Sequence, residues 1–127
     1  MTKKSSGSKT KNLLLNHIAE LALQKKAANV ISLDIRNLSS VTNHYLICSA
    51  DTEPQVKAIA DNIRKGTLEK PWHLEGYEKL KWVLLDYVDV IVHVFRSEER
   101  HYYNLEKLWA DAPKIKFFDE DTKKTIS

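Results

Sequence analysis

The stretch that most constrains the fold is residues 82–95, which read WVLLDYVDVIVHVF. Two apolar runs, Trp82–Leu85 and Val90–Phe95, are separated by a short segment that contains Asp86 and Asp89. Both runs are rich in aliphatic and β-branched residues and are too short for helices, which predicts two strands joined as a tight hairpin. Because the runs are almost continuously apolar, both faces of the hairpin should be covered, and it should lie centrally in a sheet.

Polar residues interrupt the hairpin at three positions, Asp86, Asp89 and His93. Charged groups at the ends of buried strands usually lie where a sheet meets solvent, and binding sites often form at such edges. We therefore expect the working surface of the protein at this edge of the sheet.

The rest of the chain supplies helices and further strands. The spacing of apolar residues predicts a helix from Asn12 to about Ala28, and Thr52 with Gln55 predicts the capped start of a second helix that ends near Gly66. Three further strands are predicted at Val30–Ile35, His44–Ser49 and Trp72–Leu74. A final helix is predicted after Ser97, which would be its cap. The order α-β-β-α-β-β-β-α predicts a single α/β domain, with a mixed sheet of about five strands covered by helices.

The size and composition of the chain fit one globular domain. It has 127 residues, of which 43% are hydrophobic and 29% charged, enough for a modest core. No apolar run approaches the roughly 18 residues of a membrane span, and no secretory signal is evident at the start, so we expect a cytoplasmic protein without membrane contact. The single cysteine, Cys48, precludes an internal disulfide and is predicted as a buried strand thiol.

The net charge of +3 comes largely from the N-terminal end of the chain. Residues 1–12 hold four lysines and no acidic residue, and the middle of the chain is close to neutral. Residues 1–11 are predicted as a flexible basic tail, 12–110 as the domain, and 111–127 as a loosely held charged tail in which Phe117 and Phe118 dock at best. A neutral domain argues against one that grips DNA or RNA across its own surface, and favours a protein partner that carries basic residues.

Catalysis is the less favoured interpretation of the polar residues. Asp86 and Asp89 with His93 have the residue types for metal-dependent phosphoryl or nucleotidyl transfer, but the glycines stand alone and form no phosphate-binding loop. The five histidines show no metal-ligand spacing, and no Gly-x-Ser-x-Gly elbow occurs. A lone histidine in an apolar strand is more often a core residue than a ligand.

Aromatic residues offer a binding surface instead. Most aromatic side chains at strand and helix spacing pack in the core, yet they are also enriched at interface hot spots. One or two exposed rings beside Glu75, Asp86 and Asp89 would make an apolar patch with an acidic rim, which suits a partner carrying lysines or arginines. Five aromatic residues lie on or beside the hairpin and the final helix: Trp82, Tyr87, Tyr102, Tyr103 and Trp109.

Three separated motifs closely resemble the Iojap-like ribosomal silencing factor family: LDIRNLSS at residues 33–40, the hairpin at 82–95, and YYNLEKLW at 102–109. The resemblance implies a nucleotidyltransferase-like α/β fold without demonstrated transferase activity. It also implies a factor that binds the large ribosomal subunit through its fourteenth ribosomal protein, prevents the small subunit from joining, and so lowers translation when nutrients are short. Members of the family self-associate as homodimers when free, and no cofactor follows from the resemblance.

Positions that match the family motifs carry its functional surface onto this chain. The hypothesis is that Trp82 and neighbouring aliphatic residues form the apolar contact, while Glu75, Asp86 and Asp89 pair with basic residues of the ribosomal protein. The full set of predicted partner-binding residues is Glu75, Gly76, Trp82, Leu84, Asp86, Asp89, His93 and Tyr103.

The sequence departs from the family pattern in two places. Val88 stands where a glycine is usual in the hairpin turn, and valine fits poorly if that turn needs a positive φ. Residues 49–55, SADTEPQ, replace a segment that is more often Gly-Thr-Ser followed by Arg-His. No function is therefore carried onto residues 49–55.

Two other hypotheses remain open at this point. One is a metal-dependent nucleotidyltransferase that uses Asp86 and Asp89. The other is a nucleic-acid binder that acts through the lysine-rich residues 1–11.

Overall fold

The computed structural model describes residues 2–119 of the chain, with side chains from residue 13 onward. The described elements, in chain order, are α1 (Thr2–Gln24), β1 (Ala28–Asp34), β2 (His44–Ala50), α2 (Glu53–Gly66), β3 (His73–Glu75), β4 (Trp82–Asp86), β5 (Val90–Arg96), α3 (Ser97–Tyr103), α4 (Leu105–Leu108) and β6 (Lys114–Lys116). The α/β class predicted from the sequence is confirmed, and the division of the chain at residues 12 and 110 stays a prediction.

The strands form one mixed sheet in the order β3-β4-β5-β2-β1-β6. The predicted hairpin is confirmed as β4 and β5, in which Trp82 pairs with Phe95 and Asp86 with Ile91. β5 continues into a parallel pairing with β2, whereas the other neighbouring strands are antiparallel. The hairpin therefore places β5 at the centre of the sheet and β4 one strand from its edge.

The sheet has six strands rather than about five, because part of the predicted C-terminal tail joins it. β6 pairs antiparallel with β1, and the Phe117 amide extends the pairing by donating to the Val30 carbonyl at 2.8 Å. Phe117 packs against the core while Phe118 stays exposed. Residues 120–127 of that predicted tail lie outside the described part of the chain.

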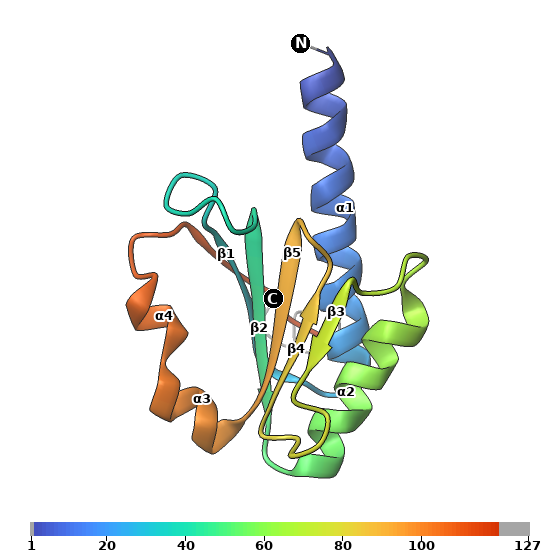
Figure 1. Cartoon of the computed structure of the whole chain (residues 1–127), viewed down its shortest axis with the longest axis vertical. Coiled ribbons are helices and arrows are strands. Elements are labelled where there is room, and N and C mark those ends of the chain that lie inside the picture. Colours follow the sequence, from blue (N-terminus) through green and yellow to red (C-terminus); the bar gives the residue numbers. More distant parts are fainter. Residues whose placement is uncertain (1, 120–127) are drawn as a thin grey trace.

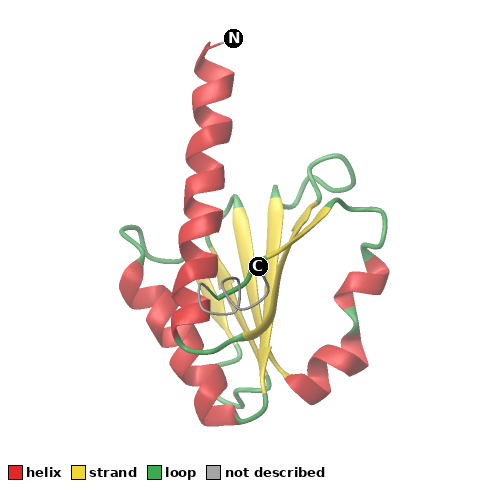
Figure 2. Cartoon of the chain, turned by 180° about the vertical axis from the view of Figure 1, so that it is seen from behind, coloured by secondary structure: helices red, strands yellow, loops and turns green. Residues whose placement is uncertain are grey.

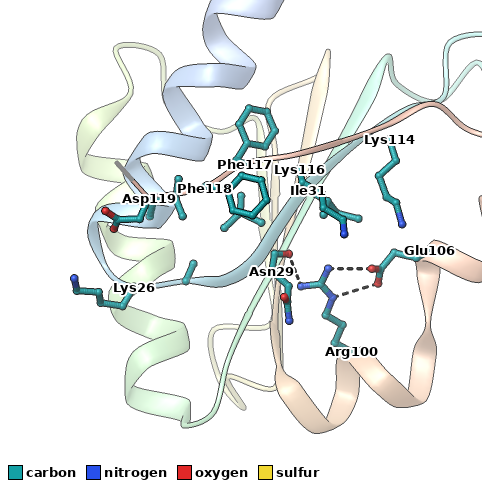
Figure 3. Close-up of a pocket in the computed structure, with 13 residues that line it drawn as sticks. Lys26, Asn29, Ile31, Arg100, Glu106, Lys114, Lys116, Phe117, Phe118 and Asp119 are labelled. Carbon is teal, nitrogen blue, oxygen red and sulfur yellow. Dashed lines mark hydrogen bonds and ion pairs between the residues drawn. The ribbon is translucent and has the colours of Figure 1, made fainter. Parts of the chain in front are cut away.

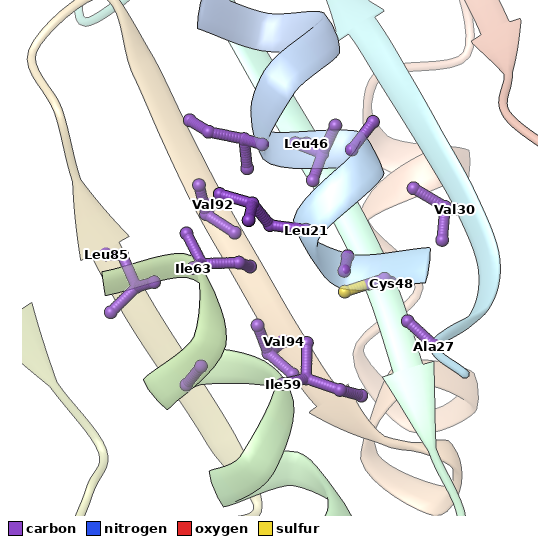
Figure 4. Packing of buried hydrophobic residues seen from close by; sticks show 14 of the residues in the cluster. Leu21, Ala27, Val30, Leu46, Cys48, Ile59, Ile63, Leu85, Val92 and Val94 are labelled. Atoms are coloured by element: carbon purple, nitrogen blue, oxygen red, sulfur yellow. The ribbon is translucent and has the colours of Figure 1, made fainter. Parts of the chain in front are cut away.

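Helices cover both faces of the sheet (Figure 1). α1 and α2 lie together on one face, which we call the first face, and α3 and α4 lie on the opposite, second face, as the view from behind in Figure 2 also shows. The main core lies between the first face and the α1–α2 pair (Figure 4) and includes Ile18, Leu46, Cys48, Ile59, Ile63, Leu85 and Val92. Burial raises the pKa of the Cys48 thiol to about 12, consistent with its predicted structural role.

Helix α2 begins as the sequence predicts. The Thr52 hydroxyl accepts a hydrogen bond from the Gln55 amide at 3.3 Å, which satisfies one free N–H group of the first turn. The Gln55 side chain does not complete a capping box; its amide donates instead to the carbonyls of Lys25 and Lys26. The Gln55 side chain thus ties the start of α2 to the turn that follows α1.

In the other two helices predicted from the sequence, the predicted caps, Asn12 and Ser97, do not serve as caps. α1 begins at Thr2, so Asn12 lies inside the helix and is not its cap. Ser97 is the first residue of α3 rather than its cap, and its hydroxyl donates to the Ala50 carbonyl and to Asp51. This contact joins the start of α3 to the end of β2.

Within residues 2–119, no helix is long and apolar enough to cross a lipid bilayer.

Candidate functional site

The strand register brings most of the predicted partner-binding residues onto the second face. Successive side chains of a strand alternate between faces, so Trp82, Leu84 and Asp86 of β4 point to the same side. Leu84 pairs with Glu75 of β3 on one side and with His93 of β5 on the other. The three β4 side chains are only half-buried and Glu75 is exposed. The β3–β4 part of the second face is therefore open to a partner.

Aromatic rings run from this open area toward the helices. The Trp82 ring stacks on Phe95 with centroids 4.7 Å apart, and the centroid of the Tyr103 ring of α3 lies 4.8 Å from that of Trp82. The Tyr45 ring meets His93 edge-on at 4.8 Å. We call Tyr45, Trp82, Leu84, His93 and Tyr103 the aromatic patch. Tyr103 is 50% exposed, so the patch reaches the surface of the molecule.

His93 is the buried member of the aromatic patch and is held neutral. Its side chain is 5% exposed, and burial lowers its pKa to about 4, because the charged imidazolium would lose its hydration there. The Trp82 indole N–H donates to Nδ1 of His93 at 3.1 Å, so the proton of the neutral ring is assigned to Nε2. Among the described residues, Nε2 has no hydrogen-bond partner. His93 thus fixes the orientation of Trp82.

The predicted acidic rim is divided between two places. Glu75 lies on the open face, where its carboxylate contacts Nε2 of His73 at 2.7 Å. Asp86 and Asp89 flank the β4–β5 turn: Oδ1 of Asp86 accepts from the Val88 amide at 2.8 Å, and Oδ1 of Asp89 accepts from the Asn43 side chain at 3.3 Å. Both aspartates therefore shape the turn in addition to carrying negative charge.

Gly76 serves the site through its backbone. It has a φ of +91°, and a Cβ at this position would lie 1.9 Å from the Trp82 carbonyl oxygen. Only glycine lets the chain pass this close to β4. Gly76 positions Glu75 beside Leu84 rather than offering a contact of its own.

The arrangement lends no support to metal-dependent transfer by Asp86 and Asp89. Both carboxylates are engaged in the turn, as described above. Within the described part of the chain, no three His, Cys, Asp or Glu side chains come together as a group that could hold a metal ion. The surface has half-buried rings with acidic groups beside them, a combination that is also found at protein–protein interfaces.

Tyr45 is the member of the patch that sequence reasoning missed. It lies on β2, which pairs in parallel with β5, and this register sets Tyr45 beside Ile91 and places Ile47 opposite His93. Burial raises the pKa of the Tyr45 hydroxyl. Trp109 packs edge-on against Tyr45 at 5.7 Å and belongs to the wall beneath the patch. Only the pairing of two strands distant in sequence could have identified Tyr45.

Comparisons with known proteins agree on one family. The family described as "Ribosomal silencing factor during starvation" matches residues 8–127. The chain is 48% identical to ribosomal silencing factor RsfS of Halalkalibacterium halodurans over 72% of this chain and 80% of the relative. It is 45% identical to RsfS of Bacillus subtilis over 70% of this chain and 78% of the relative. A crystal structure of a Chromobacterium violaceum protein has a TM-score of 0.75 at 30% identity, covering 78% of this chain and 85% of that chain.

Proposed function

The chain belongs to the ribosomal silencing factor family, and from that premise we propose that it represses translation by binding the large ribosomal subunit and blocking the small one. The contact is made with the fourteenth ribosomal protein of the large subunit, through the aromatic patch and the acidic groups beside it. The factor acts in the cytoplasm by occupying a surface, and this mode of action involves neither catalysis nor a cofactor.

The observation that carries this proposal is the open part of the second face. Trp82 and Leu84 are half-buried on a sheet face that α3 and α4 cover only in part, and Tyr103 of α3 extends the same surface. Aromatic side chains in such positions contribute most of the binding energy at interfaces, because a partner removes their remaining surface from water. A rigid sheet supplies this patch in a fixed geometry, so little entropy is lost on binding.

Charge gives the patch a preference for a basic partner. Glu75 is exposed on the open face, and Asp86 lies on the same side of the sheet. Ribosomal proteins that contact RNA carry many lysines and arginines, and complementary charge accelerates encounter and disfavours wrong partners. The free protein is a homodimer in this proposal.

The first test follows the purified protein with separated ribosomal subunits by sedimentation. We expect it to travel with the large subunit and to reduce subunit joining. Trp82→Ala should raise the Kd for the large subunit about fivefold or more, as loss of a hot spot of about 1 kcal/mol does. Because Trp82 also packs on Phe95, urea unfolding must establish that the variant is folded. Tyr103→Ala, at a more exposed ring, should weaken binding without that complication.

A charge-reversal variant and its matched control test the acidic side of the patch. Glu75→Lys places the opposite charge on the open face and should slow association and weaken binding, most strongly at low salt. Glu20→Lys makes the same change at an exposed position of α1, on the other face of the sheet, and should leave binding unchanged. A wild-type protein that binds neither subunit would refute the function. Equal binding by the wild type and by all three patch variants would refute the interface alone.

A further inference from the structure

A cavity of about 580 Å³ opens at the opposite edge of the sheet from β3, between the end of α1, strand β1 and strand β6 (Figure 3). A second hollow of about 800 Å³ continues from it along α1, and the two share Phe117 and Phe118. Three strands, β1, β2 and β5, separate β6 from β4, and only β3 lies beyond β4, so this cavity is distinct from the aromatic patch. The two hollows together form an elongated site.

Positive charge dominates the wall of the cavity. It is lined by the cations Lys26, Arg100, Lys114 and Lys116 and by the acids Glu106 and Asp119. Glu106 is committed to Arg100, with its two carboxylate oxygens 3.2 and 3.1 Å from the guanidinium nitrogens. Among the described residues, the three lysines form no ion pair. The cavity therefore carries a positive surplus that an anionic ligand would neutralise.

The register of β6 aims two of these lysines to one side. Lys114 pairs with Leu33 and Lys116 with Ile31, and both partners point to the second face. Ile115, between them, points the other way. The two ammonium groups are thus presented along the edge strand, one strand repeat apart, and Lys26 stands on the far side of the opening. Cations spread along a wall suit a chain of phosphates better than a single phosphate group.

Two phenylalanines complete the site. The Phe117 ring packs partly on the core, and Phe118 is 47% exposed; both rings lie at the cavity beside Lys116 in Figure 3. A solvent-exposed ring next to cations is the arrangement by which proteins bind unpaired nucleotides, because bases stack on the ring while lysines contact the backbone. An acidic peptide would use the lysines but would gain little from the exposed ring.

We propose that this cavity binds unpaired, single-stranded RNA. Lys26, Lys114 and Lys116 contact successive phosphates, and a base stacks on Phe118. The elongated shape and the separated lysines favour a strand over a free nucleotide. The site goes beyond the protein–protein contact proposed above and does not depend on it. It also differs from a nucleic-acid site in residues 1–11, because it lies in the folded domain.

The test uses the full chain and a short fluorescent oligouridine, whose binding is followed by anisotropy at several salt concentrations. Lys114→Gln with Lys116→Gln should weaken binding about tenfold or more and reduce the slope of log Kd against log salt by about 1.4, since each single-strand phosphate contact contributes about 0.7. Phe118→Ala should weaken binding about fivefold or more with little change in the salt slope, because stacking is not ionic.

A matched control separates the cavity from general charge. Lys79→Gln with Lys81→Gln removes two exposed lysines at the same spacing near β4, and every variant keeps the lysines of residues 1–11. This control should bind oligouridine like the wild type. Equal weakening by both double variants, or by neither, would overturn the proposal. Unlabelled oligoglutamate serves as a competitor; displacement as effective as that by unlabelled RNA would identify a general anion site and also refute it. Trp82→Ala should retain full RNA affinity.

Discussion

Val88 adopts a backbone conformation that its side chain disfavours. Its φ is +74°, in the left-handed region where a β-branched residue is strained. The turn is held by the Asp86 carboxylate, which accepts from the Val88 amide, and by the Thr42 hydroxyl, which donates to the Val88 carbonyl at 2.7 Å. The sequence pointed to this strain, because valine occupies a position where the family usually has glycine.

Replacing Val88 by glycine should stabilise the protein. The left-handed conformation costs a non-glycine residue about 1–2 kcal/mol, and glycine removes this cost. Part of the gain, about 0.5–1 kcal/mol, is offset because glycine loses more conformational entropy on folding. The Val88 side chain is 57% exposed, so little packing is lost. Urea unfolding should therefore show a gain of up to about 1 kcal/mol. Val88→Ala keeps the Cβ and should gain much less; equal gains in both variants would contradict the backbone explanation.

His93 should make stability fall in mild acid. Its pKa is about 4 when folded against an ordinary value of 6.5, so the unfolded chain binds the extra proton first as the pH drops. Its contribution is complete above pH 6.5 and is lost as the pH falls toward 4, for a total of about 3 kcal/mol. The lowered pKa values of the Asp34 and Glu99 carboxylates act at lower pH, below their ordinary values of 3.8 and 4.5.

The measurement is the free energy of unfolding in urea between pH 7 and pH 5. His93→Gln retains hydrogen-bonding atoms near Trp82 but cannot bind the proton, so its stability should vary much less over this range. His101→Gln, at an exposed position of α3, should follow the wild type. A His93→Gln variant that loses stability as steeply as the wild type would refute this assignment.

At the level of elements, Arg100 joins α3 to an irregular part of β1. The β1–β2 pairing shifts register between Ala28 and Ile31, and Asn29 has a φ of +50°. The Arg100 guanidinium, only 9% exposed, donates to the Asn29 carbonyl at 2.7 Å and to the Ser49 hydroxyl at 3.1 Å. It thereby satisfies backbone oxygen atoms that the bulge removes from the strand ladder.

Arg100→Lys should destabilise the fold by about 2 kcal/mol, because a single ammonium group cannot reach the bulge and also bind Glu106 through two atoms. Arg36→Lys is the matched control, since Arg36 forms a more exposed pair with Asp34, and its effect should stay below about 0.5 kcal/mol. Chemical unfolding gives both values. Similar losses in the two variants would mean that the bulge does not need the planar guanidinium.

The elements that sequence patterns predicted are those with strong local signals. The hairpin of β4 and β5 and the buried stripe of α2 follow from apolar periodicity alone. β6 was missed because Lys-Ile-Lys is short and polar, and it becomes a strand only by pairing with β1, far away in sequence. Ser97 was misplaced by one position, because its hydroxyl bonds to the end of β2 instead of to the amides of its own helix.

For the whole molecule, the predicted site residues came together only in part. One patch contains Trp82, Leu84, His93 and Tyr103, with Glu75 at its side. The family motifs had pointed to each of these positions. Tyr45 required knowledge of the parallel β2–β5 pairing, and Gly76 proved to act through a close backbone approach. The basic cavity could not be predicted either, because it joins residues from both ends of the chain around β6. Periodicity identifies elements, whereas long-range pairing decides which side chains meet.

The two edge strands of the sheet affect how copies of this protein associate. Both edge strands, β3 and β6, are three residues long, and β6 carries two exposed lysines. A short, charged edge offers few free backbone groups to another strand and repels a second copy of itself. A dimer built from side-chain contacts is therefore favoured over one built by pairing of edge strands, and strand-by-strand growth into fibres is disfavoured.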